Sequence, residues 1–255
     1  GAPRVLRNDG SGRFTDITKD TAFAAINEAR SSYFFDWDND GDRDALVLTA
    51  QRMYLLESRD GKFVDVSADS RFDRLTTTGL TSATVADYDN DGRLDFYVAN
   101  YGDLARSPVL DYFNSKRGYN NQLFRNMGDG RFDMHTREAG LDEDNLRWSF
   151  AAVSLDFDRD GDLDVYIPQG HLLTLPSDEP ADETADDSVD VRHRLFRNDL
   201  QVAEDGTRTL RFTDVTDTCG IDETGYGMGV VAADFDNDGW CDLYVTNFGV
   251  NRPYR

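Results

Sequence analysis

Aspartate recurs at a fixed spacing in four short segments of the chain. Each segment reads D-x-D-x-D-G-x-x-D, and the four span residues 36–44, 87–95, 156–164 and 234–242. Carboxylates at positions 1, 3 and 5 of a tight loop converge on one point, and the glycine at position 6 permits a sharp bend. The carbonyl at position 7 and the carboxylate at position 9 can complete an all-oxygen shell, which is the coordination that a hard cation such as Ca²⁺ prefers.

The sequence therefore predicts four Ca²⁺ ions, one in each loop. Zinc and most transition metals are disfavoured, because the ligand positions contain neither Cys nor His. The predicted carboxylate ligands are Asp36, Asp38, Asp40, Asp44, Asp87, Asp89, Asp91, Asp95, Asp156, Asp158, Asp160, Asp164, Asp234, Asp236, Asp238 and Asp242, and the predicted carbonyl ligands are those of Asp42, Arg93, Asp162 and Trp240.

The residues around these loops separate them from an EF-hand. An EF-hand needs a bidentate Glu at position 12 and a helix on each side. Position 12 is instead Val47, Val98, Ile167 or Val245. The flanking residues alternate or run apolar with β-branched and aromatic side chains, which is typical of strands. Each loop is therefore predicted to connect the two strands of a hairpin.

A second predicted hairpin follows each of the first three loops, within residues 52–66, 122–132 and 194–215. Each unit then contains four antiparallel strands, which is the content of a propeller blade. The loops begin 51, 69 and 78 residues apart, as expected for a fixed unit with variable insertions. We expect an all-β propeller, with approximate repeat boundaries at 1–29 (half blade), 30–80, 81–148, 149–226 and 227–255 (half blade).

Charge and composition argue against nucleic-acid binding, against a membrane-spanning segment and against enzymatic activity. The chain has 255 residues and a formal net charge of −22, and its acidic residues are 41 Asp and 8 Glu. This charge would repel a nucleic-acid backbone, and no apolar run is long enough to span a membrane. The sequence contains no G-x-S-x-G, H-E-x-x-H or phosphate-binding glycine loop, so we expect no enzymatic activity.

The aspartate loop, followed by an LFRN-x-GDG-x-F-like hairpin, resembles the FG-GAP/VCBS repeats of integrin-α-like calcium-binding β-propellers. The sequence of these repeats is most similar to the repeats of bacterial secreted proteins and of cartilage-acidic-protein-like, ASPIC-UnbV-associated chains. This resemblance implies Ca²⁺ in all four loops and a ring of about seven blades. Residues 4–17 match a second hairpin without its first, and residues 251–255 begin another. We therefore favour part of a larger propeller over a closed four-bladed ring in which the two ends share a blade.

Two insertions, residues 101–120 and 170–193, are predicted to lie on the face opposite the aspartate loops, together with the loops between blades. Long loops on a rigid scaffold often bind partners, and aromatic side chains often anchor them. The aromatic candidates on this face are Tyr112, Phe113, Tyr119 and Trp148.

The predicted function is that of a non-catalytic, calcium-binding interaction or adhesion module for protein or glycan partners, in an extracellular, secreted or periplasmic location. The alternative is an accessory subunit or domain of a larger secreted or periplasmic enzyme complex. Two alternatives also stay open for Cys219 and Cys241, which either form a disulfide or remain free thiols.

Overall fold

The computed structural model describes residues 3–70, 79–102, 120–142, 148–170, 192–222 and 224–255. Within these ranges the regular secondary structure is almost entirely β-strand, and no described helix could span a membrane. The elements are β1 (Leu6–Asn8), β2 (Phe14–Asp16), the 3-10 helices η1 (Thr18–Asp20) and η2 (Ala22–Ala25), β3 (Ala29–Phe35), β4 (Asp44–Thr49), β5 (Met53–Arg59), β6 (Lys62–Asp65), β7 (Leu80–Ala86), β8 (Asp95–Asn100), β9 (Gln122–Asn126), β10 (Phe132–Met134), β11 (Val153–Leu155), β12 (Asp164–Ile167), β13 (Arg194–Asn198), β14 (Gln201–Val202), β15 (Arg208–Thr209), β16 (Phe212–Asp214), β17 (Tyr226–Ala233), β18 (Asp242–Phe248) and β19 (Arg252–Tyr254).

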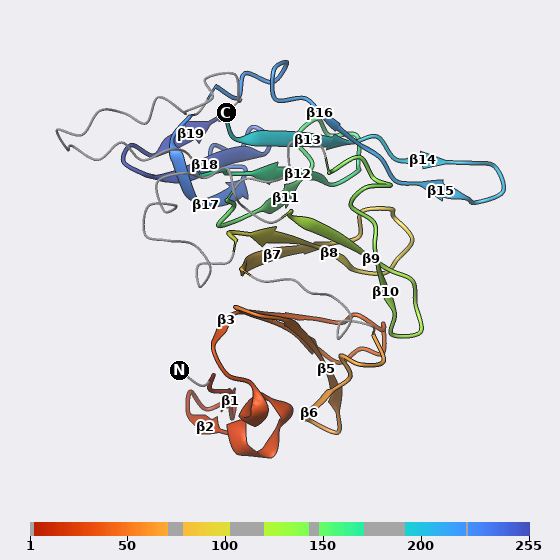
Figure 1. The fold of residues 1–255 in the computed structure, drawn as a ribbon, viewed down its shortest axis with the longest axis vertical. Helices are drawn as coiled ribbons and strands as arrows, with labels where there is room; N and C mark the ends of the chain where they lie inside the picture. Colours follow the sequence, from red (N-terminus) through yellow and green to blue (C-terminus); the bar gives the residue numbers. More distant parts are fainter. Residues whose placement is uncertain (1–2, 71–78, 103–119, 143–147, 171–191, 223) are drawn as a thin grey trace.

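Four antiparallel sheets follow one another along the chain. Their strand orders are β3-β4-β5-β6, β7-β8-β9-β10, β11-β12-β13-β16 and β17-β18-β19. Figure 1 shows them stacked in this sequence order, from the N-terminal sheet at one end to β17–β19 at the other. These meandering sheets are propeller-like blades, so the prediction of an all-β architecture is confirmed.

The second strand of each of the first three blades is buried on both of its faces. Every residue of β4, β8 and β12 is buried. Successive side chains of a strand point to opposite faces, and the cores follow this alternation: Phe96 and Val98 enter the core shared with the first sheet, whereas Tyr97 enters the core shared with the third. The inner strands therefore read as continuous apolar runs, since each packs between two neighbouring sheets.

The stack is open, so the closed four-bladed alternative is wrong for this structure. The N-terminal hairpin β1–β2 pairs with no strand of the last sheet. Instead, β19 lies beside β18 in the position that the hairpin would need, with Tyr244 paired to Pro253. The N-terminal segment packs against the first sheet, where Phe23 and Ile26 cover Val47.

An asparagine side chain connects successive blades at the aspartate-loop end. Asn126, the last residue of β9, donates from Nδ2 to the backbone oxygen of Trp37 in the preceding blade, at 2.7 Å. Asn198, the last residue of β13, donates in the same way to the oxygen of Tyr88, at 2.8 Å. Both asparagines are buried. The carbonyl at position 2 of an aspartate loop is therefore held by the next blade.

We predict that Asn126→Ala lowers the free energy of unfolding by about 2–3 kcal/mol, because it leaves a buried carbonyl without a donor. Asn8→Ala is a matched control. Asn8 and Asn126 both accept a backbone hydrogen bond two residues on, from Gly10 and Gly128, but Asn8 is exposed. We expect its replacement to change stability by less than about 0.5 kcal/mol. Urea denaturation of both variants checks this, and equal losses would contradict a contribution from the inter-blade bond.

Candidate metal centres

Each aspartate loop closes the hairpin between the first two strands of a blade, as predicted. The residue before the loop and the aspartate at position 9 form the last cross-strand pair of the hairpin. The four closing pairs are Phe35–Asp44, Ala86–Asp95, Leu155–Asp164 and Ala233–Asp242. Strand pairing therefore fixes position 9 directly opposite the start of the loop.

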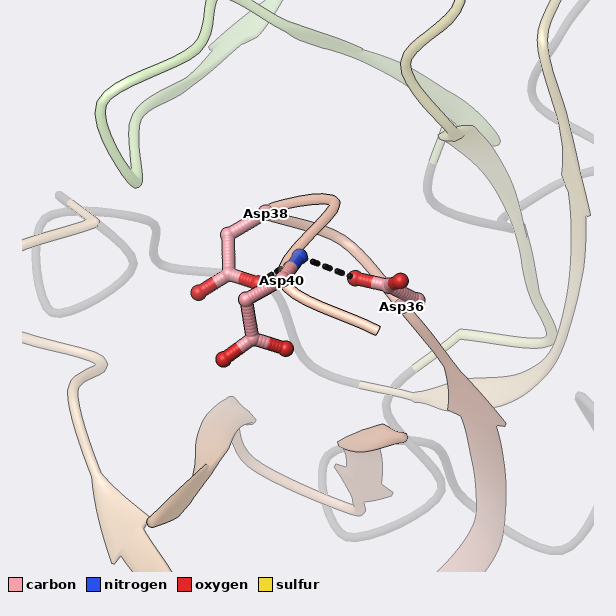
Figure 2. Close-up of side chains that lie close together, drawn as sticks. All are labelled: Asp36, Asp38 and Asp40. Carbon is pink, nitrogen blue, oxygen red and sulfur yellow. Dashed lines mark hydrogen bonds between the residues drawn. The ribbon is translucent and has the colours of Figure 1, made fainter. Parts of the chain in front are cut away.

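Backbone conformation turns the remaining carboxylates toward one another. In the first loop, Asn39 has φ 61° and Gly41 has φ 92°, which is the left-handed region that Asn and Gly adopt most readily. The amide of Asp40 donates to Asp36 Oδ1 at 3.1 Å and to Asp38 Oδ1 at 3.2 Å (Figure 2). Because the Asp36 carboxylate also accepts from the Gly41 amide, the loop folds around its first carboxylate.

Three carboxylates in each loop place a ligand oxygen within 4.8 Å of the other two. Positions 1 and 3 belong to the group in every loop. Position 5 is the third member in the first loop, and position 9 is the third member in the other three. The groups are Asp36, Asp38 and Asp40; Asp87, Asp89 and Asp95; Asp156, Asp158 and Asp164; and Asp234, Asp236 and Asp242.

The other predicted ligands lie in the same loops but outside these groups. At position 5, Asp91, Asp160 and Asp238 accept the amide of position 7, and at position 9 of the first loop Asp44 is buried. The carbonyls of Asp42, Arg93, Asp162 and Trp240 remain predicted ligands.

The aspartate at position 9 also ties its loop to the third strand of the blade. Asp95 is 1 % exposed. Its Oδ2 accepts from the Tyr88 amide at 3.1 Å, and its Oδ1 accepts from the Asn126 amide at 2.7 Å. Asp164 accepts from the amides of Phe157 and Asn198 in the same way. Position 9 therefore organises the loop as well as contributing a carboxylate to it.

Burial makes the charged form of these aspartates unfavourable without a cation. It raises the pKa of Asp44 to about 6, that of Asp164 to about 7 and that of Asp95 to about 8, although backbone amides oppose the shift. Burial also raises the pKa of Asp38, and the nearby charges of Asp40 and Glu57 add to that shift. A bound divalent cation would favour the ionised carboxylates.

The third loop has two carboxylate oxygens without a donor among the residues that the structure describes. Asp156 Oδ1 and Asp158 Oδ1 are both buried and neither has a hydrogen-bond partner there, and both residues belong to the carboxylate group of that loop. Buried polar atoms without partners are uncommon in folded proteins, and a bound ion can supply the missing partner. The residues present therefore fit a hard cation with oxygen ligands.

Arginine side chains beside the loops are functional candidates that the sequence interpretation missed, since it considered only the carbonyl of Arg93. The guanidinium of Arg125, from β9, contacts the carboxylate of Asp89, and that of Arg93 contacts Asp91. Arg255, at the end of the chain described, lies 3.6 Å from Asp236. The repeated F-R and Y-R pairs in the third strands could have indicated these contacts.

Side chains at position 4 connect each loop to the next. Asn39 donates to the backbone oxygen of Gly92 at 2.9 Å, and Asn90 donates to Asp162 Oδ1 at 2.7 Å. Arg159 lies over the ring of Trp240, 5.0 Å from its centre. The four loops therefore form one continuous row.

An additional hairpin, β14–β15, connects β13 to β16 and was not predicted. The hairpin leaves β13 and enters β16 at the end of the sheet where the third aspartate loop lies. Asn198, the last residue of β13, pairs with Phe212, the first residue of β16, and its amide donates to Asp164. Arg208 in β15 reaches the second loop and donates to the backbone oxygen of Asn90 at 3.2 Å. The hairpin β14–β15 therefore extends from the face of the molecule that carries the aspartate loops.

The prediction that Trp148 is an exposed aromatic residue available for partner binding is wrong. It is 2 % exposed and packs with Tyr101 and Tyr226, whose hydroxyl oxygens lie 2.8 Å apart. Trp148 therefore belongs to a small core between blades. Tyr112, Phe113 and Tyr119, and most of the two insertions, lie outside the described residues.

Cys219 and Cys241 are both free thiols, which is the second of the two alternatives left open. Cys241 immediately precedes β18 at the loop end of the last blade. Cys219 is exposed and follows the far end of β16, in a turn where its amide donates to the Val215 oxygen. The two residues therefore lie at opposite ends of their sheets.

A comparison with known protein families shows which repeats this chain resembles. A family model described as FG-GAP-like repeat matches residues 1–47 and 36–98, and these ranges take in the first two aspartate loops. Residues 1–98 are therefore similar to FG-GAP-like repeats. The third and fourth loops repeat the motif of the FG-GAP-like segment position by position. The finer likeness to cartilage-acidic-protein-like or ASPIC-UnbV-associated chains remains a prediction.

Comparisons with whole proteins add little to the FG-GAP-like assignment. No curated protein matches the chain. One similar solved structure concerns specific recognition of non-reducing terminal N-acetylglucosamine by an Agrocybe aegerita lectin. It is 18% identical with a TM-score of 0.47, and the match covers 86% of this chain and 48% of that one. The chain thus spans about half the length of that lectin.

Proposed function

We propose that this chain is a non-catalytic calcium-binding β-propeller segment that binds one Ca²⁺ in each aspartate loop and presents loops to a protein or glycan partner. The observation that carries the calcium part is the convergence of three carboxylates in every loop, each within 4.8 Å of the others. Ca²⁺ takes six to eight oxygen ligands, and carboxylates and backbone carbonyls supply them here.

The absence of catalysis is part of the proposal. The buried carboxylates with raised pKa values, Asp44, Asp95 and Asp164, all belong to the aspartate loops. Their amide hydrogen bonds and shared position in every blade support a structural role. Perturbed pKa values therefore point to cation sites in this fold, although they often mark catalytic groups elsewhere.

An extracellular or periplasmic location and an interaction or adhesion role complete the proposal. Calcium is abundant in the extracellular space, where modules with weak sites can stay loaded. The row of loops would then be a rigid face, and partners would bind through the loops at the opposite ends of the blades. Glycan-array binding and protein pull-down with the calcium-loaded chain distinguish the two classes of partner.

Native mass spectrometry in millimolar calcium tests the metal assignment directly. We expect four bound Ca²⁺ ions, and one fewer in the variant Asp156→Asn, which removes a carboxylate charge from the third loop. Asp129→Asn is the matched control, because Asp129 is an exposed acid on a turn outside the loops. Zinc in place of calcium, or no bound metal, would contradict the proposal.

A further inference from the structure

One position of the third strand faces each aspartate loop. Strand register aligns Leu56, Phe124, Phe196 and Tyr254, since each pairs with the residue that follows position 9 of its blade. The next residue along the strand is therefore equivalent in all four blades. It is Glu57 in the first blade, and Arg125, Arg197 and Arg255 in the other three.

The three arginines differ in how they contact the aspartate at position 3 of their loops. Arg125 contacts Asp89, which is fully buried, and also lies 3.9 Å from Asp91 Oδ2. Arg255 is 3.6 Å from Asp236, but both side chains are substantially exposed. Arg197 donates from Nε to Asp199, outside its loop, at 2.7 Å, and its charge still opposes the rise that burial causes in the pKa of Asp158.

The first blade reverses the charge at this position. Glu57 lines the same recess as Asp38, between the first and second loops. Its two carboxylate oxygens accept from Arg59, whose side chain is 54% exposed. Although this ion pair is bidentate, the charge of Glu57 still adds to the rise that burial causes in the pKa of Asp38, so Glu57 adds negative potential to the first loop.

An arginine on a buried carboxylate competes with a metal ion for the same oxygens. The contact between Arg125 and Asp89 lies out of solvent, where Coulomb interactions are stronger than in water. Two more arginines surround the second loop, since Arg93 contacts Asp91 and Arg208 donates to the Asn90 carbonyl. A cation entering the second loop must displace or tolerate a guanidinium on its position-3 carboxylate, whereas the equivalent strand position of the first blade is the acidic Glu57.

We propose that this single strand position grades the calcium affinity of the four loops, with residues 36–44 the tightest site and residues 87–95 the weakest. The inference rests on the proposed calcium function and deepens it. In the calcium-free protein Arg125 acts as an internal counterion for Asp89. The chain therefore fills its sites in order as calcium rises, instead of all at once.

Calorimetric calcium titration of the full chain at constant salt tests this proposal. Arg125→Gln is expected to tighten binding at one site by about tenfold, a change within the range that ligand charge produces in calcium loops. The same variant should have a lower melting temperature in chelator, because Asp89 then lacks its counterion. Opposite effects on affinity and on calcium-free stability distinguish competition from simple damage to the fold.

Matched variants assign the effect to its loop. Arg197→Gln should change affinity less than Arg125→Gln, because Arg197 is bonded to Asp199 outside the loop. Adding Asp87→Asn to Arg125→Gln should abolish the gain if it belongs to the second loop. Glu57→Gln, in a different blade, should weaken one site, and it provides an independent test if Arg125→Gln does not fold.

Two outcomes are distinguishable. If the unaltered chain binds no calcium, the proposed function fails and this inference fails with it. If the chain binds calcium but Arg125→Gln binds no tighter, or Glu57→Gln binds no more weakly, the grading is overturned and the calcium function stands.

Discussion

Removal of calcium by excess chelator is expected to lower the melting temperature by roughly 5–11 °C for each site that was loaded. An ion bound only by the folded state adds about 2.7 kcal/mol when its concentration is about 100 times its dissociation constant. For a chain of this size about 1 kcal/mol corresponds to roughly 2–4 °C. Loss of the ion also leaves the carboxylate groups of each loop facing one another, which adds like-charge repulsion.

Differential scanning calorimetry with and without chelator measures this effect. Asp156→Asn should reproduce the loss of one site in the presence of calcium and reduce the response to chelator by a similar amount. Asp129→Asn should retain the full response, because this exposed residue lies outside the loops. An identical melting curve in calcium and in chelator would show that the loops contribute nothing through a bound ion.

The second large effect is an inverted pH dependence of the calcium-free protein, which is expected to be more stable at pH 5 than at pH 8. Burial raises the pKa of Asp44, Asp164 and Asp95 to about 6, 7 and 8, whereas an unfolded Asp titrates near about 3.9. The folded state therefore holds more protons than the unfolded state between about pH 4 and pH 8. Its free energy of unfolding falls as pH rises through that window.

Each pKa unit corresponds to about 1.4 kcal/mol, so the loss across the window amounts to several kcal/mol. Asp16 has the opposite shift, because hydrogen bonds from Thr18 and Arg4 lower its pKa. Its contribution is lost only as pH falls below about 4, outside the window. Calcium should reverse the trend, since it binds the ionised carboxylates. Urea denaturation at pH 5 and pH 8, in chelator and in calcium, measures all four conditions.

Asp95→Asn isolates the largest of these contributions. In chelator at pH 8 we expect it to raise stability, because it removes a buried charge and keeps the shape of the side chain. At pH 5 the gain should shrink, since Asp95 is already protonated there. The variant should also lose the calcium response of the second loop. An equal loss of stability at both pH values would mean that hydrogen bonding by Asp95 outweighs the cost of its charge.

The sequence was most informative where residue type and local geometry are linked. The four aspartate loops and the strands beside them could be predicted because carboxylate spacing, a left-handed glycine and apolar alternation are all local features. The exposure of Trp148 could not, since it depends on Tyr101 and Tyr226 from other blades. Arg125 was missed for the same reason: its role appears only when β9 is placed beside β8.

The ends of the chain were also beyond local reasoning. Residues 4–8 and 252–254 have similar strand patterns, and either could have filled the place beside β18. Pairing of β19 with β18 and packing of Phe23 and Ile26 on the first sheet decided between them. The fate of Cys219 and Cys241 likewise depended on which ends of their sheets the two residues occupy.

Because asparagine bonds join only neighbouring blades, the stability of the molecule can be described as that of a linear series of repeats. Each sheet gains stability from its own strands and from the neighbours that it touches, as in repeat proteins. Asn126 bonds to Trp37 and Asn198 bonds to Tyr88, so the blade β7–β10 takes part in both junctions. The last sheet takes part in neither of these two bonds, and Val231 and Phe248 on it are 51% and 71% exposed. Local opening should therefore begin at the ends of the stack and reach the second blade last.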